Sequence, residues 1–398
     1  MMINGKKKKL IVAVKNPFRE SDVIRFNIEG LADQFDLIVL DCSEWLMPIS
    51  GKSRGMSEVS FSYVKRINTY RDLKNTENLE NAYVIDFVGL FSTASMQLFD
   101  FLISRGCKVV VIDSGPYPSP GPTRSTQSLI NKIRIILTNR LIQRFIYARW
   151  LKFYALFLKD LTPDIALVSG TSWKSNPRFF KARKIVAAHS FDCETFLEIN
   201  AGRGKKGSIE RSEKPFAVYL DENIACHEDN AEMGLKNPVS GEGFLGTLHN
   251  YFLQYEKETG NVVKIAAYPS TDISLYRQYF GDREILFKQT ASLIKDSEAV
   301  FAHASTAISF CVLWKKPVFF LVNDEIKNSW YLADIESAAS LLNAPMCDIN
   351  SNFCAKFYAE NSSIDQEAYK NYLDTYIQTE GSPSQSLWMI LKKTIEDS

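Results

Sequence analysis

The sequence predicts an α/β protein with two Rossmann-like domains, each built on a parallel sheet. Three observations indicate this. Short β-branched runs alternate with helical stretches, a pattern typical of strand–helix–strand units. The alternation stops at a segment rich in Gly, Lys and Ser and then begins again. The length of 398 residues fits two to three domains, at about 150 residues for each.

Composition excludes several classes of protein. Hydrophobic residues are 45% and charged residues 23% of the chain, as in globular proteins, so a disordered chain is excluded. The 47 basic and 46 acidic residues leave a net charge of +1, which argues against a nucleic-acid binder. The 7 cysteines are dispersed without a CxxC pair, as expected of reduced thiols in the cytoplasm. The apolar run at 10–14 is too short for a signal peptide and predicts a first strand.

The first domain is expected over residues 1–200. Its strands are predicted at 10–14, 37–40, 83–89, 108–115, 165–170 and 184–190. Between the third and fourth strands, apolar residues recur at helical spacing over 93–106, and Gly106 suits a helix C-terminus. A long helix is predicted over 126–160. Residues 201–215, rich in Gly, Lys and Ser, form the expected linker.

The second domain is expected over 216–380. Strands are predicted at 216–223, 261–269, 284–287, 298–305 and 316–324, and helices at 243–260, 308–314, 336–342 and 365–378. Residues 381–398 form a final helical segment that can cross back to the first domain. The whole is therefore expected to place two Rossmann-like halves on either side of a cleft.

Familiar catalytic and cofactor motifs are either absent from the sequence or lie outside the strand–turn–helix context that they require. It contains no GxxxxGK[ST] or HExxH, so P-loop hydrolysis and zinc proteolysis lack their sequence signals. GxGxxG occurs at 202–207 and 241–246, and GxSxG at 51–55. None of these directly follows a predicted strand, which is the context that NAD binding and α/β-hydrolase chemistry require. The 4 histidines do not pair with one another or with cysteines at metal-ligand spacing. We expect no metal site and no cofactor.

Polar residues follow three strands of the second half, where ligands collect in open α/β sheets. The first set is Asp221-Glu222-Asn223, the second is Tyr268-Pro269, and the third runs from His303 to Ser305-Thr306. Ser305 and Thr306 precede an apolar helix, so hydroxyls, backbone N–H groups and the positive helix end converge on a point that suits a phosphate. An N-cap without a ligand is the alternative for Ser305.

These three motifs, in this order, resemble those of bacterial GT-B glycosyltransferases that use CMP-activated sialic acid, Kdo or related nonulosonates. Those families carry an acidic D/E-D/E-G motif, an HP motif and a Ser-Thr motif at a helix start. The stretch from about 216 to 325 also looks like proteins of surface or capsular polysaccharide biosynthesis. The resemblance implies a nucleotide-sugar donor bound through Tyr268, Pro269, His303, Ser305 and Thr306, and a glycan acceptor.

Two residues depart from the family motifs. Asn223 replaces the glycine, and Tyr268 replaces the histidine that contacts the donor phosphate in the sialyltransferases. Asp221 or Glu222 is the expected catalytic carboxylate. It would deprotonate the acceptor in an inverting transfer or attack the anomeric carbon in a retaining one, and the sequence does not choose between these.

Four residues near strand ends of the first half are candidates for the acceptor side. Asp113 and Ser114 follow the strand at 108–112, while His189 and Asp192 follow the strand at 184–188. A buried structural histidine is the alternative for His189.

Two other functions remain open on the same architecture. One is an NDP-sugar transferase or nucleotide-sugar epimerase, and the other is an inactive scaffold that binds glycan or a partner.

One region of the chain is strongly basic. Residues 124–184 hold 13 basic and 2 acidic residues, with aromatic residues interleaved. Such a helix over 126–160 is typical of binding to an anionic membrane surface, and would suit a lipid-linked acceptor. A partly buried helix whose Lys and Arg side chains extend to solvent is the alternative. We expect a cytoplasmic protein, peripheral on the inner face of the membrane in the first case.

Overall fold

The computed structural model describes residues 7–47, 61–113, 115, 118, 150, 153–154, 159–202, 214–227, 230 and 236–398. The chain divides into two compact units. The first comprises Met1–Ser114, Thr126–Phe191 and Thr379–Ser398, and the second comprises Gly115–Ser125 and Asp192–Gln378. Most of the long helix expected over 126–160 and residues 203–213 of the expected linker lie outside the described residues.

The first unit is built on a parallel sheet of seven strands in the order β3-β2-β1-β4-β5-β6-β7. Alternate residues of β1 face opposite sides: Leu10 and Val12 belong to one apolar cluster, and Ile11 and Ala13 to another. Both faces are therefore buried, which explains the continuous apolar runs in the sequence. The strands are β1 (Lys9–Val14), β2 (Asp36–Asp41), β3 (Val64–Arg66), β4 (Tyr83–Phe87), β5 (Lys108–Ile112), β6 (Ile165–Val168) and β7 (Lys184–Ala187).

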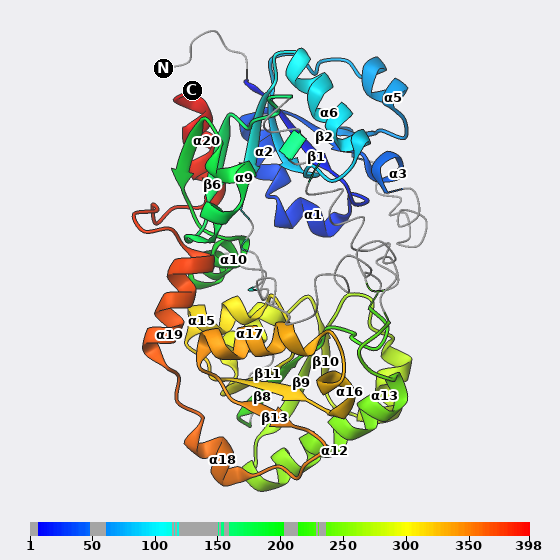
Figure 1. The fold of residues 1–398 in the computed structure, drawn as a ribbon, viewed down its shortest axis with the longest axis vertical. Helices are drawn as coiled ribbons and strands as arrows, with labels where there is room; N and C mark the ends of the chain where they lie inside the picture. The colour runs from blue at the N-terminus through cyan, green and yellow to red at the C-terminus, as the bar shows by residue number, and fades with distance from the viewer. Residues whose placement is uncertain are drawn as a thin grey trace, which may run out of the picture. The chain divides into compact units, whose positions relative to one another are not determined.

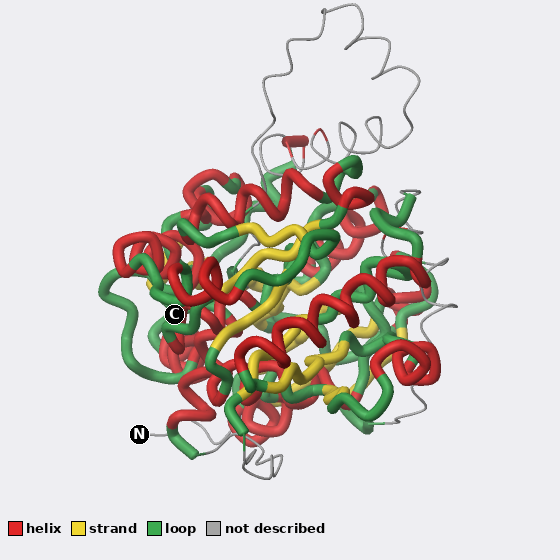
Figure 2. The backbone as a smooth tube through the Cα atoms, turned by 90° about the horizontal axis from the view of Figure 1, so that it is seen from below, coloured by secondary structure: helices red, strands yellow, loops and turns green. Residues whose placement is uncertain are grey.

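Helices cover both faces of this sheet (Figures 1 and 2). One face packs against α1 (Glu20–Arg25), α2 (Ile28–Gln34) and α20 (Leu387–Glu396). The other packs against α3 (Ser43–Leu46), α5 (Tyr70–Asn75) and α6 (Thr93–Ser104). Ser92 caps α6 by accepting a hydrogen bond from the Ser95 amide. The short η2 (Ser172–Ser175) and α9 (Pro177–Phe180) connect β6 to β7.

The second unit holds a parallel sheet of six strands in the order β10-β9-β8-β11-β12-β13. In chain order this is 3-2-1-4-5-6, the strand order of a doubly wound Rossmann fold. All residues of β8, β11 and β12 are buried. The strands are β8 (Phe216–Leu220), β9 (Val262–Ala267), β10 (Ile285–Phe287), β11 (Ala299–Ala302), β12 (Val318–Val322) and β13 (Met346–Asp348).

A single apolar cluster unites the second sheet with its helices. The longest helix that the structure describes in this unit, α12 (Gly241–Thr259), buries an aromatic stripe that includes Phe244, Tyr251, Phe252 and Tyr255. The other described helices that follow it are α13 (Ile273–Phe280), α14 (Thr290–Asp296), α15 (Ile308–Trp314), α16 (Asp324–Lys327), α17 (Leu332–Leu342), α18 (Ala355–Glu360) and α19 (Gln366–Tyr372), which continues into η3 (Leu373–Ile377). In addition, α10 (Phe191–Asn200) runs into this unit from the first.

The prediction of two Rossmann-like α/β halves is confirmed by the two strand orders. In each sheet the direction of winding reverses once, between β1 and β4 in the first and between β8 and β11 in the second. Ligands of such sheets bind outside the carboxyl ends of the strands at this reversal. Within the described residues, no helix has the length and apolar character needed to cross a membrane.

Candidate functional site

The three polar motifs of the second half meet at the carboxyl edge of the second sheet. β8 pairs with β9 on one side and with β11 on the other. Asp221 and Glu222 therefore leave the central strand, with Tyr268 on one flank and Ser305 on the other. This places the motifs at the reversal between β8 and β11, the position at which such folds bind nucleotides.

Asp221 is 6% exposed and organises the loop beneath the site. Its carboxylate accepts hydrogen bonds from the Asn223 amide at 2.8 Å, the Tyr268 amide at 3.1 Å and the Tyr276 hydroxyl at 2.7 Å. The Thr271 hydroxyl supplies a fourth bond. Two carboxylate oxygens offer about four acceptor positions, so Asp221 is occupied in holding the loops after β8 and β9.

Asn223 shows how the chain accommodates the missing glycine of the acidic motif. Its φ is 48°, in the left-handed region. Glycine enters this region without cost, and asparagine is one of the few other residues that enter it readily. The Asn223 side chain also lies 3.5 Å from the Cys226 carbonyl oxygen. The replacement therefore keeps the turn after Asp221 and Glu222.

Glu222 has different surroundings from its neighbour. The Tyr331 hydroxyl donates to Glu222 Oε2, whereas Oε1 is buried and has no hydrogen-bond partner in the described part of the chain. Burial raises the pKa of Glu222 to about 8, and the charge of Asp221 adds to the rise. The Tyr331 hydroxyl and the backbone amides of His303 and Ala304 oppose it. This carboxyl group can exchange a proton near neutral pH.

His303 belongs to the core beneath the site. It is fully buried, its Nδ1 lies 2.7 Å from the Leu321 carbonyl oxygen, and its Nε2 lies 3.2 Å from the Tyr219 hydroxyl. Because a carbonyl only accepts, Nδ1 carries the proton and Nε2 accepts from Tyr219. Burial lowers the pKa of His303 to about 4. With no exposed surface and both nitrogens bonded, His303 supports β11 and cannot reach a nucleotide directly in this structure.

Ser305 and Thr306 lie at the surface of the site, just before α15. The Ser305 hydroxyl accepts from the Ala307 amide at 3.3 Å and keeps its own proton to donate. Thr306 is exposed. Across the site Pro269 is exposed and Tyr268 is half-buried, with the imidazole of His227 against the Tyr268 ring, the two centroids 5.0 Å apart.

The candidate acceptor-side residues that the structure describes are divided between the two units. Asp113 is buried after β5, and its backbone amide donates to the Leu167 carbonyl oxygen at 2.9 Å. Ser114 lies outside the described residues. His189 is 1% exposed, and its Nε2 lies 3.0 Å from the Gln385 carbonyl oxygen, so it holds the C-terminal segment to the first unit. Asp192, in the first turn of α10, belongs to the second unit.

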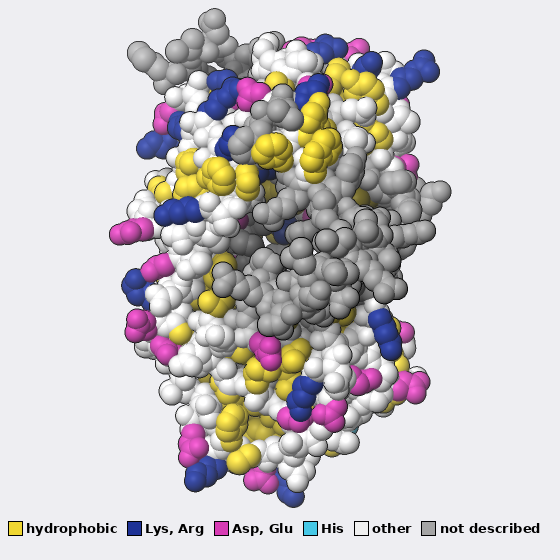
Figure 3. Space-filling view, in the orientation of Figure 1, with side chains coloured by type: hydrophobic (Ala, Val, Ile, Leu, Met, Phe, Trp, Pro, Cys, Tyr) yellow, Lys and Arg dark blue, Asp and Glu magenta, His cyan; other side chains and the backbone are white. Residues whose placement is uncertain are grey.

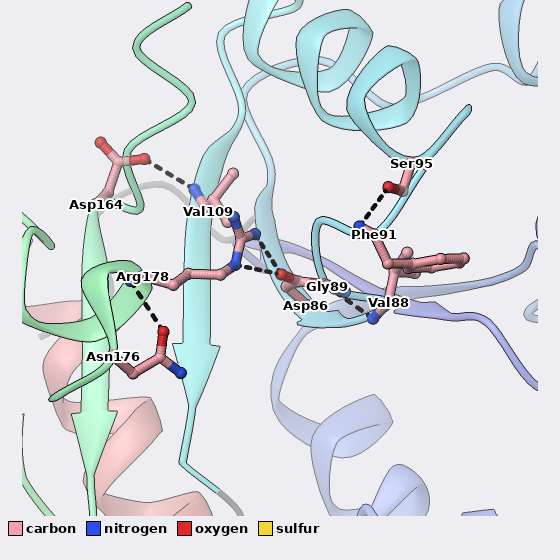
Figure 4. Close-up of polar contacts among 9 residues, drawn as sticks. All are labelled: Asp86, Val88, Gly89, Phe91, Ser95, Val109, Asp164, Asn176 and Arg178. Carbon is pink, nitrogen blue, oxygen red and sulfur yellow. Dashed lines mark hydrogen bonds and ion pairs between the residues drawn. The ribbon is translucent and has the colours of Figure 1, made fainter. Parts of the chain in front are cut away.

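The first unit carries a buried ion pair that the sequence did not indicate (Figure 4). Asp86 and Arg178 are 8% and 7% exposed, and Arg178 Nε donates to Asp86 at 3.0 Å. Asp86 also accepts from the amides of Val88 and Gly89, at 2.8 and 2.7 Å. The guanidinium lies 5.1 Å from the centroid of the Phe99 ring. The pair therefore fixes the loop after β4 and joins it to α9.

In the described part of the chain, no cluster of three or more His, Cys, Asp or Glu residues could hold a metal ion. The residues that shape the site but were missed by sequence reasoning are Tyr331, Thr271 and Tyr276. All are common residue types whose role depends on contacts across 50 or more positions of the chain. No local pattern marks them.

No family model and no curated protein matches the sequence. Solved structures do resemble its fold. The wall teichoic acid polymerase TagF, in a variant form, has a TM-score of 0.49 and 11% identity over 98% of this chain and 90% of its own. The glycosyltransferase SnogD from Streptomyces nogalater has a TM-score of 0.48 and 9% identity over 98% and 100%.

A third similar structure is the UDP-GlcNAc 2-epimerase of Methanocaldococcus jannaschii, in complex with UDP-GlcNAc and UDP. Its TM-score is 0.46, with 12% identity over 98% of this chain and 99% of that chain. Likenesses at this level of identity and TM-score carry no donor, acceptor or mechanism over to this chain.

Proposed function

We propose that this protein is a GT-B glycosyltransferase that binds its nucleotide-sugar donor on the second unit. The observation that carries the proposal is the position of Glu222, a buried carboxyl group with a raised pKa, at the reversal between β8 and β11. Ser305 and Thr306 lie beside the same reversal. A proton-exchanging group next to a candidate phosphate site is what transfer from an activated sugar requires.

Glu222 is the proposed general base, and Asp221 the residue that holds the loops around it. A base is most effective when its pKa lies near the working pH, as that of Glu222 does. The proposed reaction inverts the anomeric centre: Glu222 takes the proton of the acceptor hydroxyl while the nucleotide leaves.

The proposed donor is a CMP-activated acidic sugar such as sialic acid, Kdo or another nonulosonate. This part of the proposal rests on the resemblance of the three motifs. Ser305 and Thr306 would donate to the donor phosphate, and Tyr268 and Pro269 would line the opposite flank. The acceptor would be a glycan of bacterial surface polysaccharide assembly.

The first experiment measures thermal stabilisation of the protein by CMP, UDP, GDP and dTDP. We expect selective stabilisation by CMP and its loss in a Ser305→Ala/Thr306→Ala double variant. Ser340→Ala, an exposed serine in the last turn of α17, is the control and should bind as the wild type does. Selective stabilisation by UDP would replace the proposed donor, and no response to any nucleotide would refute the transferase.

The second experiment tests the base. Glu222→Gln should lower the rate of transfer by about 10²–10⁴-fold, the usual contribution of general base catalysis, and leave nucleotide affinity unchanged. Glu336→Gln, an exposed glutamate on α17, should keep full activity. In the wild type, kcat/KM should rise with pH up to about 8, where Glu222 ionises. A Glu222→Gln variant with full activity would remove Glu222 from the mechanism.

A further inference from the structure

The Glu222 carboxyl group is held by a tyrosine from a distant part of the chain. Tyr331 immediately precedes α17 and is 9% exposed. Its hydroxyl accepts from the Ala304 amide at 3.3 Å and donates to Glu222 Oε2. Because the amide supplies the proton received by the hydroxyl oxygen, the hydroxyl's own proton points to Glu222. Successive donors of this kind polarise and strengthen one another.

Each of the two adjacent carboxyl groups thus has a tyrosine of its own. Tyr276 donates to Asp221 together with three other donors, which together occupy both oxygens of that carboxylate. Tyr331 is the only described side chain that donates to Glu222, and its bond is to Oε2. The second oxygen, Oε1, is buried and receives no side-chain hydrogen bond from the described residues. This difference assigns different tasks to two residues that the sequence could not tell apart.

We propose that Tyr331 is the positioning residue of this site: its hydroxyl holds Oε2 of Glu222 and so fixes the carboxyl group that takes the proton of the acceptor hydroxyl. This inference rests on the proposed function, in which Glu222 is the general base. The O–H bond of the acceptor breaks as a new O–H bond forms at the Glu222 carboxylate. The freed electron pair of the acceptor oxygen forms the glycosidic bond to the anomeric carbon. The bond between that carbon and the donor phosphate oxygen breaks, and the nucleotide departs with its electron pair.

The groups that face Glu222 determine how Tyr331 should act on its titration. Asp221 is the charged neighbour, and its charge favours the protonated form of Glu222. His303 is neutral above pH of about 4, and burial raises the pKa of Tyr219 well above its usual value. The charges of His303 and Tyr219 therefore stay constant between pH 5 and 9. Tyr331 hydrogen-bonds to the ionised carboxylate and lowers the pKa of Glu222, so its removal should move the titration to higher pH.

The test follows the carboxyl ¹³C signal of Glu222 during a pH titration of the protein without substrate. Loss of one signal in Glu222→Gln assigns it. In Tyr331→Phe the midpoint should move to higher pH, because the ring remains and only the donor is lost. Tyr369→Phe is the matched control: this buried tyrosine of the same unit donates to the Lys316 carbonyl oxygen at 2.7 Å, and its loss should leave the midpoint unchanged.

A second substitution protects the test against a folding defect in Tyr331→Phe. Replacement of Tyr331 with 3-fluorotyrosine makes the hydroxyl a stronger donor with almost no change in shape, so the midpoint should move to lower pH. An unchanged midpoint in a folded Tyr331→Phe protein, or an equal change in Tyr369→Phe, would overturn the inference. These outcomes need no substrate and do not depend on whether the protein transfers sugar.

The pH dependence of the kinetics distinguishes a positioning role of Tyr331 from a merely structural one. In Tyr331→Phe, kcat/KM should fall about tenfold at pH 7, which corresponds to the loss of one hydrogen bond to a charged group. It should recover to within about twofold of the wild type at high pH, where Glu222 is ionised in both proteins. KM for the donor should not change. An equal loss at every pH would show that Tyr331 only stabilises the fold.

Discussion

Asp221 and Glu222 are neighbours in the chain, yet their carboxyl groups differ in nearly every physical respect. Four donors saturate Asp221, whereas Glu222 is buried with one bonded oxygen. The four bonds hold the Asp221 carboxylate in place, whereas desolvation stabilises the protonated form of Glu222. The difference in function that we propose for the pair follows from this difference in surroundings.

The buried Glu222 makes a prediction about stability. The pKa of a solvent-exposed glutamate is about 4.5, and that of Glu222 in the fold is about 8, so between these values the folded protein keeps a proton that the unfolded chain has lost. The contribution of Glu222 to the free energy of unfolding therefore falls as pH rises from about 4.5, and the loss continues above pH 8 only as a constant penalty. Glu222→Gln removes the penalty and should raise the free energy of unfolding above pH 8 by on the order of 2 kcal/mol.

Urea denaturation at pH 4.5 and 8.5 measures this effect. The gain of Glu222→Gln over the wild type should be present at pH 8.5 and nearly absent at pH 4.5. His303, whose lowered pKa makes stability fall with acid below about pH 6.5, acts equally in both proteins and cancels in the difference. A gain of the same size at both pH values would show that the variant acts through packing, not ionisation.

At the level of elements, the ion pair of Asp86 and Arg178 joins the end of β4 to α9. Arg178→Met would leave the Asp86 carboxylate buried without its counter-charge, and should cost about 3–5 kcal/mol of folding free energy. Asp86→Asn in the same background keeps an acceptor for the Val88 and Gly89 amides but removes the charge. Chemical denaturation should find the double variant more stable than Arg178→Met alone; a simple sum of two losses would contradict this.

The C-terminal helix α20 supplies a second prediction at this scale. It contributes Leu387, Trp388, Ile390, Leu391 and Ile395 to the apolar cluster on one face of the first sheet. Trp388→Ala should lower the free energy of unfolding by about 3–5 kcal/mol, since a large buried side chain is lost. Its neighbour Met389 is 48% exposed, and Met389→Ala should change stability by less than about 0.5 kcal/mol. Thermal or urea unfolding distinguishes the two.

For the whole molecule, the fold was predictable from sequence because both faces of each sheet are buried. Strands such as β1, β8 and β12 are continuous apolar runs, whereas β3 and β13 have three residues each and were not predicted. The site was partly predictable, since strand ends carry its residues. Tyr331 and Arg178 were not, because their partners lie 109 and 92 positions away, beyond any local pattern.

The distribution of charge over the whole chain leads to a final prediction. Residues 124–184 carry 13 basic and 2 acidic residues, which leaves 34 basic and 44 acidic residues elsewhere. Outside this region the described basic and acidic side chains are interspersed on the face shown in Figure 3. Most of 124–158 lies outside the described residues, but Trp150 and Phe153 are both more than half exposed. Exposed aromatic residues within a basic segment favour the interface of an anionic membrane.

Co-sedimentation with lipid vesicles tests this prediction. We expect the protein to bind vesicles that contain phosphatidylserine at low salt, because each basic residue near the surface contributes about 1 kcal/mol. Binding should be lost at about 0.5 M salt, which screens this attraction, and should be absent with neutral vesicles. Replacement of Arg134, Arg140, Arg144 and Arg149 with Gln should weaken it strongly. Replacement of the exposed Lys236, Lys257, Lys356 and Lys370 with Gln is the control and should leave vesicle binding nearly unchanged. Equal losses in the two variants would mean that net charge attracts the protein to the membrane and that the basic segment has no special role.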